Sequence, residues 1–354
     1  MRIIHTGDVH IGSILQNLPR EKAALRRTEI LEGFRRLCAY AKENGVTAVL
    51  IAGDLFDGNN VSAEIKKETF SAMQDAAPVC FFYVSGNHDD GFYSNLPLPQ
   101  NVYVFSHTRG WSSYDLPENV TVTGIDLKAL TPDQYAYLSL RQERFNILLM
   151  HGEIGSEIAL ERLQNRGIDY LALGHIHAPT AVAAQLDGRG KFRYCGCLEG
   201  RGFDECGKRG FFLLEVENGR LIGEKFLSLA KREICQRAVD ISACESYFEL
   251  ERGVLGALQD VREEDVLKLT LCGQYKPYLR KDLSLLQARL AEKFFFVKLV
   301  DESRLFIDYA QYQNDLTDRG EFVREVGRYE LSDEERDAVL EVGLKALAGE
   351  EIDL

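Results

Sequence analysis

Residues 3–12 of the chain read IIHTGDVHIG. A short apolar run at residues 3–6 passes directly into a glycine-bounded segment that carries Asp8 and His10. Runs of β-branched residues that end in such a segment are typical of strands followed by a turn. The stretch therefore predicts a buried strand whose carboxyl end presents an acid and an imidazole.

The same arrangement recurs four more times. After other short apolar runs come GDLFD at 53–57, GNHD at 86–89, MHGE at 150–153 and GHIH at 174–177. In an α/β sheet, ligands gather at the carboxyl ends of the strands, so we expect the five segments to converge in space. The candidate site residues in these segments are Asp8, His10, Asp54, Asn87, His151, His175 and His177, with Asp57 and His88 beside them.

Together these side chains indicate a metal site. Taken alone, an Asp-x-His pair or a Gly-Asp turn is common, but His-x-His places two imidazoles on one face of an extended chain. Acids and histidines gathered at strand ends would lack partners unless they shared cations. Seven ligands are more than one ion uses, and they suit two ions if one carboxylate bridges.

The donor types restrict the choice of metal. Imidazole, carboxylate and amide oxygen without thiolate disfavour structural zinc and all-oxygen magnesium or calcium sites. Mn²⁺ fits best, and Fe²⁺ and Zn²⁺ remain open. Two divalent ions roughly 3.5–4 Å apart form the arrangement that handles phosphate esters, with a bridging water as nucleophile.

Composition excludes several other classes of protein. The 354 residues are 45% hydrophobic and 27% charged, which is ordinary globular usage. No run approaches the roughly 18 apolar residues of a membrane span, and no export signal is seen, so we expect a cytoplasmic protein with reduced cysteines. The net charge of −13 means that any phosphate ligand needs local positive charge.

The spacing of apolar residues along the chain predicts that the chain has three parts. Residues 1–229 alternate strands with helices at 20–43 and 62–76, and then give a run of strands over 180–226 that predicts successive antiparallel hairpins. Residues 230–310 read strand–helix–strand–helix–strand, a small α/β domain. Residues 311–354 form an acidic helical tail, whose last helix opens with a capping box at Ser332 and Glu335.

The five segments resemble those of the calcineurin-like metallophosphoesterases, over about residues 1–226. This resemblance implies an α/β fold: a four-layer β-sandwich flanked by helices, followed here by the small cap domain and the C-terminal helices. It also implies a catalytic role for His88, as general acid or transition-state stabiliser. The implied ligands of one ion are Asp8, His10, Asp54 and His177, and those of the other are Asp54, Asn87, His151 and His175, with Asp54 as the bridge.

Within that family, GDLFDGN and GNHD differ from the GDxxDRG and GNHE of the protein phosphatases. The stretches AGDLFDGNNVS, YLALGHIHAP and GCLEGRGFDECGKRGFFLLEV are instead similar to the SbcD-like branch of DNA double-strand-break repair nucleases. This likeness implies a DNA exonuclease, with endonuclease action left open. It also implies an SbcC-like ABC-type ATPase partner that the tail docks on, and a homodimer. Some relatives carry a histidine where Asp57 stands.

Contacts to DNA are predicted at Arg201, Lys208 and Arg209, although a solvated hairpin face would have the same composition. Two other functions stay open. One is hydrolysis of small phosphodiesters such as cyclic nucleotides, against which the long extension beyond residue 230 argues. The other is a scaffold with a vestigial metal site, against which the complete ligand set argues.

Overall fold

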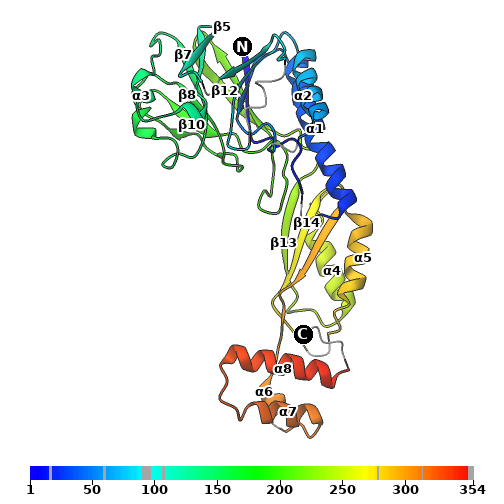
Figure 1. The fold of residues 1–354 in the computed structure, drawn as a ribbon. Coiled ribbons are helices and arrows are strands. Elements are labelled where there is room, and N and C mark those ends of the chain that lie inside the picture. The colour runs from blue at the N-terminus through cyan, green and yellow to red at the C-terminus, as the bar shows by residue number, and fades with distance from the viewer. Residues whose placement is uncertain are drawn as a thin grey trace. The chain divides into compact units, whose positions relative to one another are not determined.

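The computed structural model describes residues 1–15, 18–58, 61–89, 97–105, 108–276, 279–312 and 314–349. They form two units, Met1–Ile234 and Cys235–Leu354 (Figure 1). The predicted small domain and the tail thus fall into one unit, and the division of the chain into three domains stays a prediction.

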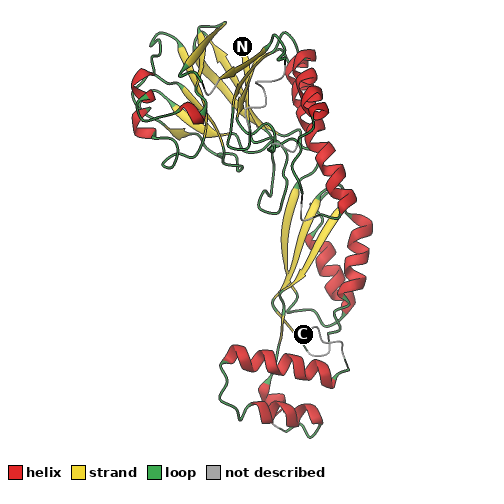
Figure 2. Ribbon diagram, in the orientation of Figure 1, coloured by secondary structure: helices red, strands yellow, loops and turns green. Residues whose placement is uncertain are grey.

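The first unit contains two six-stranded sheets (Figure 2). One has the strand order β12–β11–β1–β2–β3–β4, and the other has the order β5–β6–β7–β8–β10–β9. The strands of the first sheet are β1 (Arg2–Thr6), β2 (Val46–Ala52), β3 (Cys80–Val84), β4 (Val102–Phe105), β11 (Phe211–Glu217) and β12 (Arg220–Leu227). Those of the second are β5 (Ser112–Leu116), β6 (Val120–Gly124), β7 (Phe145–His151), β8 (Tyr170–Gly174), β9 (Ala184–Gln185) and β10 (Lys191–Tyr194).

Successive side chains of a strand point to opposite faces of its sheet, so each sheet packs against a different layer on each face. Leu50 and Phe82 of the first sheet share a buried core with Ile147 of the second. Their sequence neighbours Val49 and Phe81 face the other way, into a core shared with helices of the same unit. These helices are α1 (Arg20–Glu43) and α2 (Ala63–Asp75), and the outer face of the second sheet is covered by a third core with α3 (Gln134–Tyr137). The four-layer prediction is confirmed.

Parallel pairing brings the motif segments to a common edge. Strands β1, β2, β3 and β4 run parallel in the first sheet, and β6, β7, β8 and β10 run parallel in the second. The prediction of successive hairpins over 180–226 is confirmed for the antiparallel pair β9–β10, but it is wrong in part, because β10 and β11 lie in different sheets and the other neighbour of β10 is the parallel strand β8. Strands β11 and β12 do form a hairpin, but it joins the first sheet beside β1. An apolar pattern predicts a strand without specifying its partner.

The second unit has the predicted strand and helix order. Its three-stranded sheet has the order β13–β14–β16 and shares a buried core with α4 and α5. Strands β15 and β17 pair in a separate two-stranded sheet. The elements are β13 (Ile234–Asp240), α4 (Tyr247–Ala257), β14 (Val266–Cys272), β15 (Gln274–Tyr275), α5 (Leu283–Lys293), β16 (Phe296–Asp301), β17 (Arg304–Leu305), α6 (Tyr309–Tyr312), α7 (Asp318–Val326) and α8 (Asp333–Leu347). The capping box at Ser332 and Glu335 is confirmed. Among the described residues, no helix is both long and apolar enough to cross a membrane.

His5 is an unusual residue in the core between the two sheets. It is fully buried in β1, where its Nδ1 accepts a hydrogen bond from the Tyr170 hydroxyl (3.0 Å) and its Nε2 donates to the Leu173 carbonyl (3.2 Å). Burial lowers the pKa of His5 from 6.5 to about 3. The imidazole is therefore neutral in the folded protein at pH values where the unfolded chain is protonated.

This difference predicts acid sensitivity. As the pH falls below 6.5 toward 3, proton uptake by the unfolded state should lower the free energy of unfolding by up to about 1.4 kcal/mol per pH unit. We expect His5→Gln to be less stable than the wild type at pH 7.5 but to lose stability less steeply on acidification. Urea unfolding between pH 7.5 and 4.5, with a chelator present for both proteins, measures the two slopes. Parallel slopes would contradict the prediction.

Candidate metal centre

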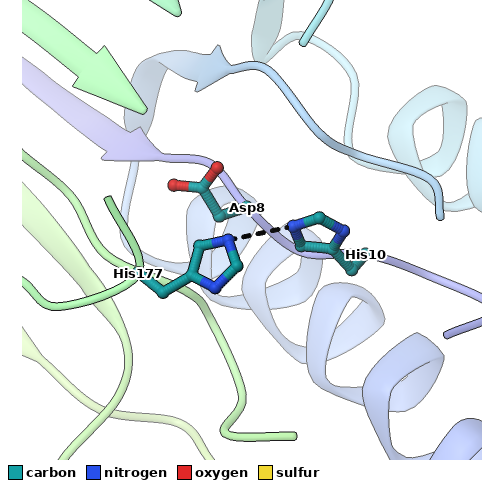
Figure 3. Close-up of side chains that lie close together, drawn as sticks. All are labelled: Asp8, His10 and His177. Carbon is teal, nitrogen blue, oxygen red and sulfur yellow. Dashed lines mark hydrogen bonds between the residues drawn. The ribbon is translucent and has the colours of Figure 1, made fainter. Parts of the chain in front are cut away.

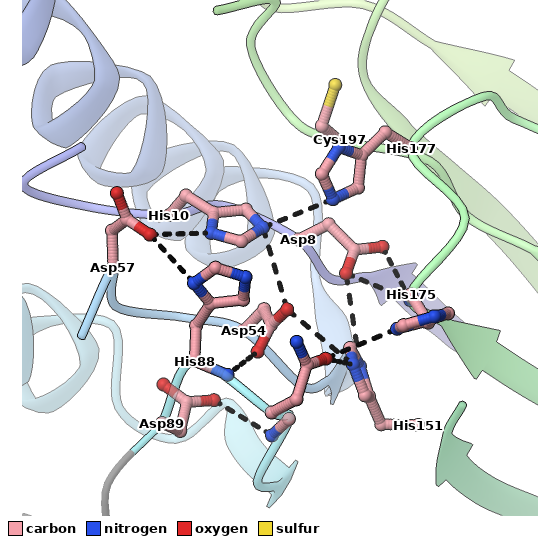
Figure 4. Close-up of polar contacts among 12 residues, drawn as sticks. Asp8, His10, Asp54, Asp57, His88, Asp89, His151, His175, His177 and Cys197 are labelled. Atoms are coloured by element: carbon pink, nitrogen blue, oxygen red, sulfur yellow. Dashed lines mark hydrogen bonds and ion pairs between the residues drawn. The ribbon is translucent and has the colours of Figure 1, made fainter. Parts of the chain in front are cut away.

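The structure brings all seven predicted ligands to one place, at the carboxyl ends of strands from both sheets. Figure 4 labels six of them, and the seventh, Asn87, contacts His151 and His175. Segments after β1, β2 and β3 contribute from the first sheet, and β7 and the segment after β8 contribute from the second. The first two segments are held together by backbone bonds, because the Asp8 and His10 amides donate to the carbonyls of Gly53 (3.0 Å) and Asp54 (2.9 Å).

Four of these ligands have a backbone conformation that non-glycine residues rarely adopt. The φ angles are +47° at Asp8, +49° at His10, +50° at Asp54 and +97° at His175. Such conformations cost of order 1–3 kcal/mol each and persist only where the surrounding structure imposes them. The strain is concentrated on the predicted ligands, which is typical of a functional site.

One group of ligand atoms comes from Asp8, His10 and His177 (Figure 3), which lie within 4.8 Å of one another. Asp8 and His10 are fully buried, whereas His177 is partly exposed. The Nε2 atoms of His10 and His177 are 3.2 Å apart. The carboxylate of Asp8 also accepts bonds from the backbone N–H of His175, at 2.9 and 3.0 Å, which fixes its orientation.

A second group lies on the other side of Asp54. His151 Nε2 is 2.9 Å from Asn87 Oδ1 and 3.5 Å from Asp54 Oδ2, and His175 Nδ1 is 3.2 Å from the same Asn87 oxygen. Asp54 Oδ2 is also 3.6 Å from His10 Nε2. This oxygen is therefore near both groups, as a bridging ligand must be.

The protonation states of the histidines in the site suit the binding of a cation. His151 Nδ1 donates to the Ala52 carbonyl (2.8 Å), so its Nε2 carries a lone pair that faces two oxygens, on Asn87 and Asp54. Electron-rich atoms that face one another repel unless a positive charge lies between them. Burial lowers the pKa of His10 to about 4 and also lowers the pKa of His151, which keeps both imidazoles in the neutral form that binds metals.

His88 lies at the exposed rim of the site, with 46% of its side chain accessible. Its Nδ1 is 3.0 Å from Asp57 Oδ1, and the same oxygen is 3.4 Å from His10 Nδ1. The hydrogen bond from His10 holds the pKa of Asp57 well below its usual range, so Asp57 is a carboxylate that only accepts. Asp57 thus orients the imidazole of His88 toward the ligand cluster, and the backbone N–H of His88 donates to Asp54 Oδ1 at 2.9 Å.

The three residues predicted to contact DNA differ in their surroundings. Lys208 is exposed. Arg209 is buried and donates to three backbone carbonyls, and Arg201 pairs with the buried carboxylate of Glu205. Their contacts to DNA stay predictions, and Lys208 is the best placed of the three.

The structure also reveals a residue that the sequence did not single out. Glu205 Oε1 lies 2.7 Å from His177 Nδ1. The only signal in the sequence was an acid in the run after β10, with no spacing that connects it to His177. Cys195 and Cys197 are buried, and burial raises the pKa of both thiols. Among the described residues, no cysteine belongs to a ligand group.

Comparisons with known proteins agree with this geometry. The family model described as calcineurin-like phosphoesterase matches residues 1–179, half of the chain. The chain is 28% identical over 241 residues to an uncharacterized metallophosphoesterase, YhaO, of Bacillus subtilis, which covers 62% of this chain and 58% of that protein. It is 27% identical over 293 residues to the DNA double-strand break repair protein Mre11 of Methanopyrus kandleri, covering 72% and 62% of the two chains.

A third relative is one of the subunits of the SbcCD nuclease of Staphylococcus epidermidis, 25% identical over 305 residues that cover 71% of this chain and 78% of that protein. The chain spans less than two thirds of the length of the first two relatives.

The position of Asp54 between the two groups gives a direct test. We expect Asp54→Asn to bind at most one Mn²⁺ per chain where the wild type binds two, because an amide bridges two cations poorly. Metal analysis of the purified proteins after dialysis measures the ratio. The matched control is Asp133→Asn, which changes an exposed aspartate directly before α3. It should bind as many Mn²⁺ ions as the wild type does. Two ions in Asp54→Asn would show that Asp54 does not bridge.

Proposed function

The chain belongs to the calcineurin-like phosphoesterases, and from this premise we propose that it is a dinuclear metal-dependent nuclease that cleaves DNA, chiefly as an exonuclease, in repair or processing. The observation that carries the proposal is the pair of ligand groups that meet at Asp54, with His88 at their exposed rim.

The residues have the following proposed roles. One ion would be held by Asp8, His10, Asp54 and His177, and the other by Asp54, Asn87, His151 and His175. When bound, two divalent ions, most suitably Mn²⁺ with Fe²⁺ and Zn²⁺ as alternatives, lower the pKa of water and neutralise phosphate charge. His88 delivers a proton to the leaving oxygen through Nε2, because its Nδ1 is held by Asp57 at 3.0 Å.

DNA as the substrate is supported by two relatives whose names describe a double-strand break repair protein and part of a nuclease. The acidic net charge does not oppose this choice. Residues 311–354 contain 13 acidic and 5 basic residues, so they carry −8 of the total −13. Two divalent ions add roughly +4 at the site itself.

A partner is proposed on the same basis. The relative from Staphylococcus epidermidis is named as one component of a nuclease of several subunits, and we extend this to an SbcC-like ABC-type ATPase. Helix α8 buries Leu340 and Leu344 against its own unit but exposes Val339, Val342 and Leu347, which makes it the proposed docking segment. A homodimer and a cytoplasmic location also stay predictions.

The central experiment compares digestion of end-labelled duplex DNA with hydrolysis of bis(p-nitrophenyl) phosphate, both with Mn²⁺. We expect the wild type to degrade DNA, and we expect His88→Ala to be slower by roughly 10²–10⁴-fold with an unchanged metal content. Equal rates for the two proteins would remove His88 from the mechanism. Hydrolysis of the small diester without any DNA cleavage, with the ATPase partner supplied, would favour a phosphodiesterase of small substrates instead.

A second experiment addresses DNA contact by Lys208. If its ammonium group pairs with one phosphate, Lys208→Ala should weaken DNA binding and reduce the slope of log affinity against log salt by about 1. Lys225→Ala removes another exposed lysine, on the edge strand β12, and is the control. Fluorescence anisotropy with labelled DNA at several salt concentrations measures both slopes. The same slope for both variants would show that Lys208 contacts no phosphate.

A further inference from the structure

His177 is held by a buried carboxylate outside the predicted ligand set. Glu205 is 3% exposed, and its Oε1 lies 2.7 Å from His177 Nδ1. Glu205 is itself fixed by Arg201, whose backbone N–H donates to Oε2 at 2.7 Å and whose Nη2 donates to Oε1 at 2.6 Å. The Cys197 thiol also approaches Oε2, at 3.7 Å.

The chemistry of this contact decides which nitrogen of His177 carries the proton. An ionised carboxylate only accepts hydrogen bonds, so a distance of 2.7 Å requires the proton to be on Nδ1. The Nε2 atom then carries the lone pair, and it faces His10 Nε2 at 3.2 Å. Arg201 Nη2 also lies 2.9 Å from Nδ1, which would suit the opposite tautomer, but this group has a better acceptor in Glu205 Oε1 at 2.6 Å.

The backbone on both sides of the contact is fixed as well. Arg209 donates to the carbonyl of His177 at 2.6 Å, to that of Glu205 at 3.1 Å and to that of Cys206 at 2.8 Å. The Cys197 amide donates to the same His177 carbonyl at 3.0 Å. One buried guanidinium therefore joins the segment after β8 to the segment that carries Glu205.

We propose that Glu205 is a positioning residue that holds His177 as the Nδ1–H tautomer and directs its Nε2 to the ion held by Asp8 and His10, with Arg201 fixing the Glu205 carboxylate. Carboxylates that accept from metal-binding imidazoles set the tautomer and raise the basicity of the ligand. The inference rests on the proposed function for the presence of the ion, whereas the tautomer is a property of the protein without metal.

The first test uses metal-free protein. Long-range ¹H–¹⁵N correlation spectra distinguish a protonated ring nitrogen from an unprotonated one. In the wild type we expect His177 Nδ1 to be protonated and Nε2 to be unprotonated. In Glu205→Gln, whose amide can donate as well as accept, we expect the two tautomers to mix. Asp204→Asn removes the same charge from the neighbouring exposed residue and should leave the spectrum unchanged.

The second test is titration of the same three proteins with Mn²⁺. We expect Glu205→Gln to bind one of the two ions about 10–100-fold more weakly, with the other ion unaffected, and Asp204→Asn to match the wild type. A wild-type His177 protonated on Nε2, or unchanged Mn²⁺ affinity in Glu205→Gln, would overturn the proposal. Failure of the wild type to bind Mn²⁺ would instead overturn the proposed function, and the tautomer result would stand independently. The wild-type spectrum remains decisive even if Glu205→Gln does not fold.

Discussion

The candidate site of the first unit depends on one constraint: several electron-rich side-chain atoms are held close together at the carboxyl ends of the strands. Imidazole nitrogens that carry lone pairs face carboxylate and amide oxygens at 2.9–3.6 Å around Asp54. Such a cluster is unfavourable without a cation, and the chain holds it in place through two packed sheets and a strained backbone at four of the predicted ligands. Local strain of this kind is common at functional sites.

Around the predicted ligands lies a second ring of acceptors, which orients four imidazoles of the site. His151 donates to the Ala52 carbonyl, His88 and His10 both approach Asp57, and His177 approaches Glu205. Each contact leaves the opposite nitrogen pointing into the site or toward the rim. The acceptors come from different parts of the chain, so the orientation of the ligands reports on the assembly of the whole unit.

Much of this could be predicted from the sequence, because the information is local. A short apolar run followed by a polar segment predicts a strand end, and five such ends predict a convergence that the structure shows. The helix at 332–348 was predicted from its capping box, which is a contact over three residues. In contrast, the parallel pairing of β10 with β8 and the contact of Glu205 with His177 join residues that no spacing rule connects. The positive φ angles of Asp8 and His10 depend on the neighbouring segment after β2, and a single segment cannot show them.

The pairing of β1 with β11 has a consequence for synthesis of the chain. Residues 2–5 lie in β1, the strand that precedes the first two predicted ligands, and their partners on one side are residues 212–215. During synthesis, the edge of β1 that pairs with β11 therefore stays unpaired until more than two hundred later residues have left the ribosome. During this interval, the unpaired strand edge is open to pairing with other chains. Fragments that end soon after His177 would leave the edge permanently exposed and prone to aggregation.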